Sequence, residues 1–314
     1  MSLTGLTRLL KATPSLGKAV DLATEGPGPL TIEIRDAAKP SFVSALAQHS
    51  TSPIIMITAE EGRAANLAQD LRHWIDQRPV LHFADCNQPA YSMLAISSEI
   101  LAQRVSVLSH LMRIVDRPLE PAPIVVTSIP ALLRRLMPPD EFRTHFLILA
   151  PETKAKIETV IRQLVTLGYV STPLVERPGE FAHRGGIIDI FPPDAHQPVR
   201  VDFFGNEIES VRRFNPDTQR SVGPAVEVLL TPASEIPTWL GPAVASSLKD
   251  LNLDPLRPED QATWLRHIEQ LEHSEYFDDA AFYTMSLMPE ASSLFAFAPN
   301  ALCVLDEPDQ MAWA

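Results

Sequence analysis

The first half of the chain alternates short apolar runs with longer amphipathic segments. Apolar residues recur at helical spacing over residues 60–75 and 97–115, which predicts two amphipathic helices. Runs typical of strands lie at 30–35, 54–58, 80–83, 124–127 and 146–149. Because strands that alternate with helices favour a parallel sheet covered by helices, residues 1–150 are predicted to be an α/β layer.

The middle of the chain changes to one helix followed by β-hairpins. Residues 151–167 carry apolar positions on one helical face, and Gly168 is expected to end that helix. Apolar and more polar positions alternate over residues 199–204, as in a strand with one buried face. Gly205-Asn206 is a two-residue hairpin signal, and residues 207–214 are the expected return strand. The pattern predicts a compact antiparallel unit.

A glycine-rich bend precedes this hairpin. Gly185 and Gly186 follow Arg184 directly, and glycine allows a backbone to bend sharply. We therefore expect Arg184 to lie on a tight turn. The next apolar run contains a single acid, Asp189, which is expected to cap a turn or to pair with an arginine such as Arg200 rather than to catalyse a reaction.

The last third returns to a helical pattern and ends in an apolar run. That run, residues 301–305, leads directly into Asp306 and Glu307. A strand that ends in two acids is similar to a Walker B sequence, whose carboxylate holds magnesium in nucleotide-binding proteins. A vestigial acidic pair is the alternative interpretation.

The phosphate-binding loop that should accompany such a strand lacks its chemistry. The loop pattern GxxxxGK[ST] needs glycines that expose backbone N–H groups and a hydroxyl that reaches magnesium. If Lys39 is the loop lysine, Glu33 and Ala38 replace the glycines and Pro40 takes the hydroxyl position, before Ser41. Residues Lys39, Ser41, Asp306 and Glu307 are therefore predicted to mark a degenerate nucleotide site.

Composition and charge exclude several classes of function. The chain has 314 residues and a net charge of −13, and residues 151–314 carry 12 bases against 25 acids. Such a surface repels phosphate backbones, which argues against tight DNA binding. No apolar run is long enough for a membrane helix, and two lone cysteines, Cys86 and Cys303, are typical of a reduced, cytoplasmic protein. No HExxH, CxxC or GxSxG motif is present, so no catalytic or metal-binding residue is predicted.

A known family shares the pattern of residues 177–221. The sequence PGEF-x-x-RGG-I-I-D-I-FPP, followed by PVR-V-DFFG-x-EIES and TQRS, strongly resembles the second domain of bacterial transcription-repair coupling factors. It resembles the corresponding domain of the excision-repair helicase UvrB more loosely. In that family the domain docks on UvrA, the damage-recognition ATPase of nucleotide excision repair.

The resemblance implies a docking face around the glycine-rich bend. It places Arg184 in that face, with Arg177, Phe181, His183 and Ile188 as further candidates. For Arg184 the alternative is an internal ion pair with Glu180 or Asp202, and for Phe181 and Ile188 it is the core. The chain departs from UvrB-like relatives at Ala182, where those proteins carry a second arginine.

The resemblance also implies the domain organisation. Residues 1–150 and 241–314 would form a RecA-like layer with a decayed Walker A loop, and residues 151–240 an inserted α+β domain that binds UvrA. A Tyr91-containing loop is similar to one that approaches DNA in helicase relatives, although a helix cap is the simpler interpretation.

The whole family is implied to be an ATP-dependent DNA translocase of the cytoplasm. It uses ATP and magnesium in a C-terminal motor, and other domains contact RNA polymerase, duplex DNA and the docking face itself. The present segment is expected to need no cofactor and to have no ATPase activity. The alternative is a UvrB-type helicase segment that binds a nucleotide through Lys39 and Asp306.

Overall fold

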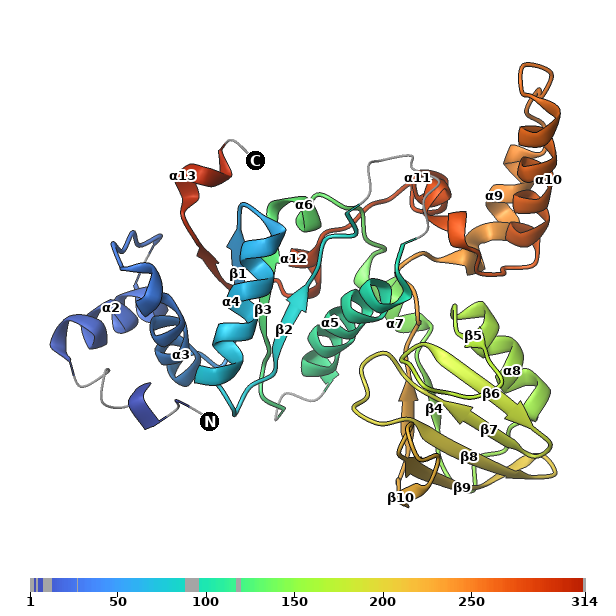
Figure 1. Ribbon diagram of the computed structural model, residues 1–314, viewed down its shortest axis with the longest axis horizontal. Helices are drawn as coiled ribbons and strands as arrows, with labels where there is room; N and C mark the ends of the chain where they lie inside the picture. The colour runs from blue at the N-terminus through green and yellow to red at the C-terminus, as the bar shows by residue number, and fades with distance from the viewer. Residues whose placement is uncertain are drawn as a thin grey trace. The chain divides into compact units, whose positions relative to one another are not determined.

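The computed structural model describes residues 3, 5–7, 13–26, 28–87, 96–116 and 120–312 (Figure 1). These residues form two compact units, each with its own sheet. Unit 1 comprises residues 1–85, 107–134 and 293–314, and unit 2 comprises residues 86–106 and 135–292. Tyr91 lies outside the described residues. The domain boundaries expected at 150 and 240 stay a prediction.

Unit 1 is built on a four-stranded parallel sheet in the order β12-β1-β3-β2. Its strands are β1 (Ile54–Thr58), β2 (Val80–Phe83), β3 (Ile124–Ser128) and β12 (Leu302–Leu305). The strands predicted at 54–58, 80–83 and 124–127 are confirmed. The final apolar run pairs with β1, as the resemblance implies.

Several helices belong to unit 1. They are α2 (Pro14–Glu25), η1 (Asp36–Ala38), α3 (Lys39–His49), α4 (Glu61–Trp74), α6 (Ile129–Leu132), α12 (Leu294–Phe297) and α13 (Pro308–Met311). A further helix, α5 (Ser98–Asp116), is divided between the two units. The amphipathic helices expected at 60–75 and 97–115 are therefore present.

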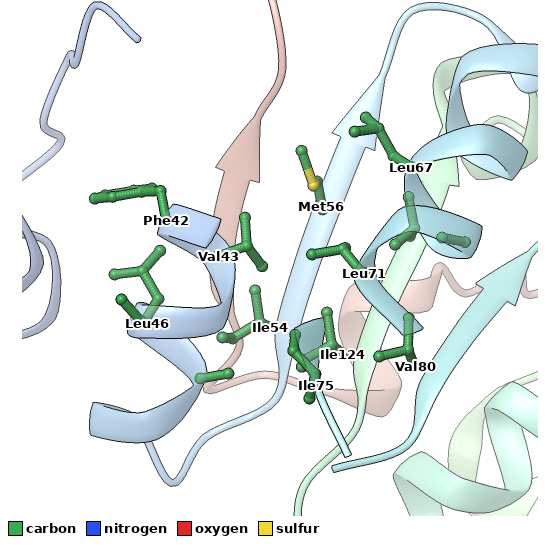
Figure 2. Packing of buried hydrophobic residues seen from close by; sticks show 14 of the residues in the cluster. Phe42, Val43, Leu46, Ile54, Met56, Leu67, Leu71, Ile75, Val80 and Ile124 are labelled. Atoms are coloured by element: carbon green, nitrogen blue, oxygen red, sulfur yellow. The ribbon is translucent and has the colours of Figure 1, made fainter. Parts of the chain in front are cut away.

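The core of unit 1 lies between one face of the sheet and helices α3 and α4 (Figure 2). Ile54 and Met56 of β1 contribute from the sheet, Leu46 from α3, and Leu71 from α4. All of these side chains are buried. Because β1 is buried along its whole length, its sequence reads as a continuous apolar run rather than an alternating one.

Two predicted strands differ from the structure. Residues 30–35 form no strand. Ile32 and Ile34 alternate with exposed residues and pack against the core of unit 1, so the period of two reflects an extended segment without a pairing partner. Residues 147–149 do form a strand, β4 (Leu147–Leu149), but it pairs antiparallel with β11 (Val228–Leu230) and not with the parallel sheet.

Unit 2 contains a six-stranded sheet in the order β10-β9-β8-β7-β6-β5. Its strands are β5 (Val170–Ser171), β6 (Glu180–Arg184), β7 (Ile187–Ile190), β8 (Val199–Phe204), β9 (Glu207–Phe214) and β10 (Ser221–Pro224). The pairs from β6 to β10 are antiparallel, which confirms the predicted hairpins. Helix α8 (Ile157–Thr166) packs Val160 and Leu164 against one face of this sheet.

Helix α8 begins at Ile157, later than the sequence suggests, and ends as predicted. Gly168 has a φ of +83°, and the N–H of Tyr169 donates to the carbonyl of Leu164 at 2.9 Å. This left-handed glycine closes the helix C-terminus.

The other helices of unit 2 are α7 (Pro139–Thr144), η2 (Thr238–Leu240), α9 (Gly241–Leu248), α10 (Pro258–Glu272), η3 (Asp278–Tyr283) and α11 (Thr284–Leu287). None of the described helices combines the length and apolarity of a membrane span.

Two hairpins of the six-stranded sheet have two-residue turns that begin with glycine. Arg184 pairs with Ile187 across Gly185-Gly186, and Phe204 pairs with Glu207 across Gly205-Asn206. Gly185 and Gly205 each have a φ of +61°, which an L side chain adopts only with strain.

We expect Gly205→Ala to lower the free energy of unfolding by about 1 kcal/mol, because alanine resists a positive φ. Urea unfolding of the purified chain measures this change. Gly223→Ala in β10 is the matched control, since Gly223 has no positive φ and open space at its Cβ position. Equal stability of the two variants would contradict the strained-turn account.

Candidate functional site

The two glycine turns lie at the same end of the six-stranded sheet. Strands β6 and β8 both end there, because β6 to β9 run alternately up and down. The N–H of Phe203 donates to the carbonyl of Gly186 at 2.8 Å, so the turns are adjacent. We name this surface, residues 184–187 and 204–207, the glycine-turn end.

The structure divides the five predicted docking residues into two groups. Arg184, Arg177 and His183 are exposed, and Arg184 belongs to the glycine-turn end. Phe181 and Ile188 are 2% and 0% exposed and pack in the core beneath α8. Their burial gives them a role in the core, which leaves the three basic residues as the surface candidates.

Arg184 forms none of the internal ion pairs considered as alternatives among the described residues. Its Nη2 donates to the carbonyl oxygen of Pro173. The Glu180 carboxylate instead accepts backbone N–H groups of Glu176 and Arg177, at 2.8 and 2.9 Å. The Asp202 carboxylate accepts from Arg212 at 2.7 Å. The planar guanidinium of Arg184 therefore lies at the surface, held by a neutral carbonyl.

Asp189 is paired as the sequence suggests. Arg200 donates to both of its carboxylate oxygens, Nε to Oδ1 at 2.6 Å and Nη2 to Oδ2 at 2.7 Å. The same guanidinium lies 5.0 Å from the ring centroid of Phe214. Because this bidentate pair joins β7 to β8 across the sheet, Asp189 has a structural role.

The sequence reasoning missed two apolar residues of the glycine-turn end. Phe204 is 80% exposed and Ile187 is 36% exposed. The signal was present in the sequence: in a strand with one buried face, two consecutive phenylalanines cannot both point inward. Phe203 packs against the core, which leaves Phe204 on the other face.

A cluster of charged residues lies in unit 1, at the predicted degenerate nucleotide site. Lys39 Nζ is 2.7 Å from Asp306 Oδ1 and 3.2 Å from Asp36 Oδ1, and it also pairs with Glu307. Arg63 of α4 pairs with both Asp306 and Asp36. We name these five residues the charge cluster. The sequence predicted that Lys39, Asp306 and Glu307 belong to one site. It did not predict that Arg63 and Asp36 belong to it as well. Ser41 is outside it, because its hydroxyl donates to the carbonyl of Ala38 at 2.7 Å.

Mutual pairing shifts the pKa values within the charge cluster. Hydrogen bonds from Arg63 and Lys39 lower the pKa of Asp36 to about 2. Burial opposes ionisation of Asp306, but hydrogen bonds from Arg63 and Lys39 outweigh it and lower its pKa. Burial also disfavours the charge on Lys39, yet its three carboxylate partners raise its pKa to about 12. All three groups are therefore charged at neutral pH.

The charge cluster should make stability depend on pH at both extremes. Asp36 has an ordinary pKa of 3.8 and a folded-state pKa of about 2, so its contribution is complete above about pH 4 and is lost as the pH falls toward 2. The contribution of Lys39 is complete below 10.5 and is lost as the pH rises through 12. We expect Asp36→Asn to reduce the loss of stability between pH 4 and pH 2.5, measured by urea unfolding. An unchanged pH profile would contradict the pairing.

The charge cluster is poorly suited to a nucleotide or a metal. Asp36, Asp306 and Glu307 lie close enough to hold a cation, but Lys39 and Arg63 already supply two positive charges to these three carboxylates. A magnesium ion would have to displace them. The lysine that would contact phosphate oxygens in a working loop is instead held by carboxylates.

Comparison with known proteins identifies the family. The UvrB interaction domain matches residues 147–236. The transcription-repair-coupling factor of Bacillus subtilis is 31% identical over 283 residues, which cover 86% of this chain and 23% of that protein. The corresponding protein of Escherichia coli is 28% identical over 206 residues, 66% of this chain and 17% of that protein. That of Mycobacterium tuberculosis is 32% identical over 225 residues, 71% of this chain and 18% of that protein.

The chain is a counterpart of the N-terminal, UvrB-like region of transcription-repair-coupling factors. It spans about a quarter or less of the length of these relatives. The matched UvrB interaction domain runs from β4 to the segment after β11 and contains the whole glycine-turn end. The charge cluster lies outside it. Within this coupling-factor region, the interaction domain and the charge cluster are therefore separate features.

Proposed function

We propose that this chain is a docking module that binds UvrA through the glycine-turn end of its UvrB interaction domain. In a longer coupling factor it would recruit UvrA to RNA polymerase stalled at DNA lesions. The observation that supports the proposal most strongly is the exposed guanidinium of Arg184. It is exposed within the matched domain and has no carboxylate partner among the described residues.

The chemistry of Arg184 suits recognition of a carboxylate on a partner protein. Guanidinium is planar and always charged, and it binds carboxylates through two parallel hydrogen bonds. The contact to Pro173 and the short Gly185-Gly186 turn restrict the position of Arg184 before binding. Restriction before binding reduces the entropy lost on association.

The proposal assigns no nucleotide chemistry to unit 1. We infer that its parallel sheet is a RecA-like layer whose phosphate loop has been replaced by the charge cluster. Lys39 pairs with Asp306 and Glu307 rather than with a phosphate, and Arg63 occupies the remaining side of Asp306. ATP and magnesium would act in a motor elsewhere in a longer protein, where duplex DNA and RNA polymerase would also bind.

Isothermal titration of the chain into purified UvrA tests the docking function. Saturable binding is expected, and no detectable heat or complex at tens of micromolar would contradict it.

Thermal unfolding with millimolar Mg-ATP tests the alternative of a helicase segment. A ligand that binds the folded state stabilises it by mass action, so we expect no shift in Tm. A rise of several degrees would support the helicase interpretation instead.

A further inference from the structure

Phe204 is a large aromatic side chain placed where the fold does not need it. It is the last residue of β8, directly before the Gly205-Asn206 turn. Phe204 is 80% exposed, whereas the preceding Phe203 packs against the core. Leaving a phenylalanine in water forgoes the favourable free energy of burying its ring. Exposed apolar side chains that gather at one place are typical of interaction surfaces.

Phe204 shares a face of the sheet with Ile187 and Arg184. Residues paired across neighbouring strands lie on one face, and the pairs are Arg184 with Ile187 and Ile187 with Asp202. Phe204 lies two residues beyond Asp202 and opposite to the core-facing Phe203. It is therefore on the same face as Arg184, at the end of the sheet where the two turns meet.

The first glycine of each turn leaves open space at its own Cβ position. A Cβ at Gly185 or Gly205 would meet no atom within 4 Å. A Cβ at Gly186 would come within 3.0 Å of the Phe203 carbonyl oxygen, so a larger residue there would disturb the contact between the turns. The result is a surface with a basic fork, an aliphatic residue and an aromatic ring beside the two glycine turns.

We propose that Phe204 is an aromatic anchor that inserts into an apolar pocket on UvrA while Arg184 pairs with a carboxylate at the rim of that pocket. This inference rests on the proposed docking function and adds a second contact of different chemistry. A few residues carry most of the binding energy in protein interfaces, and aromatic residues and arginine are enriched at these buried positions, which a rim of other contacts shields from water. Ile187 contributes apolar contact between the two.

Two observations favour UvrA as the partner of Phe204: the ring lies on the same face as Arg184, and the chain is strongly acidic. An exposed ring beside an arginine could also stack on a single-stranded nucleic acid, but the net charge of −13 opposes that partner. A second copy of the chain would bring Arg184 against the same patch, where Glu207 is the exposed acid. Self-association is therefore measured as a separate outcome.

The test compares four proteins in the same UvrA titration. Phe204→Ala is expected to weaken binding about 10-fold or more, whereas Phe204→Trp, which keeps an aromatic body, retains it to within a few fold. Val226→Ala is the matched control, because Val226 is 87% exposed in the same unit, between β10 and β11. It should bind as the wild type does. Tm values should agree for wild type, Phe204→Ala and Val226→Ala, since neither altered side chain is in the core.

The outcomes separate this inference from the docking function. If the wild type binds and Phe204→Ala binds equally well, the anchor is refuted and the docking function stands. If the wild type does not bind UvrA, both fall. Sedimentation of the wild type and Phe204→Ala provides the remaining arm. A dimer that Phe204→Ala dissociates, with unchanged UvrA affinity, would assign the patch to self-association and overturn the proposal.

Discussion

Asp306→Ala is expected to lower the free energy of unfolding by about 2 kcal/mol, since it removes the most buried carboxylate of the charge cluster and leaves Lys39 and Arg63 with fewer partners in a poorly solvated site. The Asp306 side chain is 1% exposed and has both Lys39 and Arg63 as partners. Lys39 is itself only 9% exposed. The loss should appear in urea unfolding at neutral pH as a lower midpoint with a similar slope.

Asp306→Ala should destabilise the chain more than Gly205→Ala does, because Asp306 connects several elements of unit 1. Asp306 follows β12, an edge strand of the parallel sheet, and its partners come from α3 and α4. The charge cluster thus joins β12 to helices α3 and α4 of unit 1. Asp309→Ala is the matched control, because Asp309 is an exposed acid in the adjacent helix. If both variants lost equal stability, the charge cluster would not have this role.

Arg184→Glu is expected to weaken UvrA binding about 100-fold or more, because it replaces an interfacial cation with a charge that repels the partner's carboxylate. Arg184→Lys should show an intermediate loss, since an ammonium group cannot form the two parallel bonds of guanidinium. The Tm should stay close to that of the wild type, because Arg184 is exposed and its described contact is to the Pro173 carbonyl oxygen.

The control for this prediction is a charge reversal elsewhere in the same sheet. Arg213 of β9 is exposed and lies outside the glycine-turn end. Arg213→Glu changes the net charge by the same amount, so it measures the general electrostatic effect on association. Similar losses for the two variants would indicate that only overall charge matters and would contradict a specific role for Arg184.

Local sequence signals predicted the parts of the fold that local chemistry determines. The Gly205-Asn206 turn and the strand from 54 to 58 are found where the pattern places them. The error at 30–35 arose because alternation reports which side of an extended segment is buried, not whether a neighbouring strand is present. The partner of β4 is β11, about 80 residues away in sequence, and no local pattern carries that information.

The candidate site shows the same limit. The exposure of Arg184 on a turn could be predicted because the glycines of that turn are its neighbours in sequence. Arg63 could not, since its partner Asp306 is 243 residues away. Phe181 and Ile188 looked like surface anchors because they are close to Arg184 in sequence, although their side chains are in the core. Phe204 was missed because it is 20 positions further on, and only the sheet brings it to the same face.

Hydrogen exchange of the chain with and without UvrA tests the central claim, docking through the glycine-turn end, most directly. Turn amides that face solvent exchange quickly, and binding slows them by excluding water and restricting local opening. We predict slower exchange at Gly185, Ile187 and Gly205 in the complex, with helix α10 and the charge cluster unchanged. Slower exchange confined to α10 or to unit 1, with unchanged exchange at both glycine turns, would contradict the account.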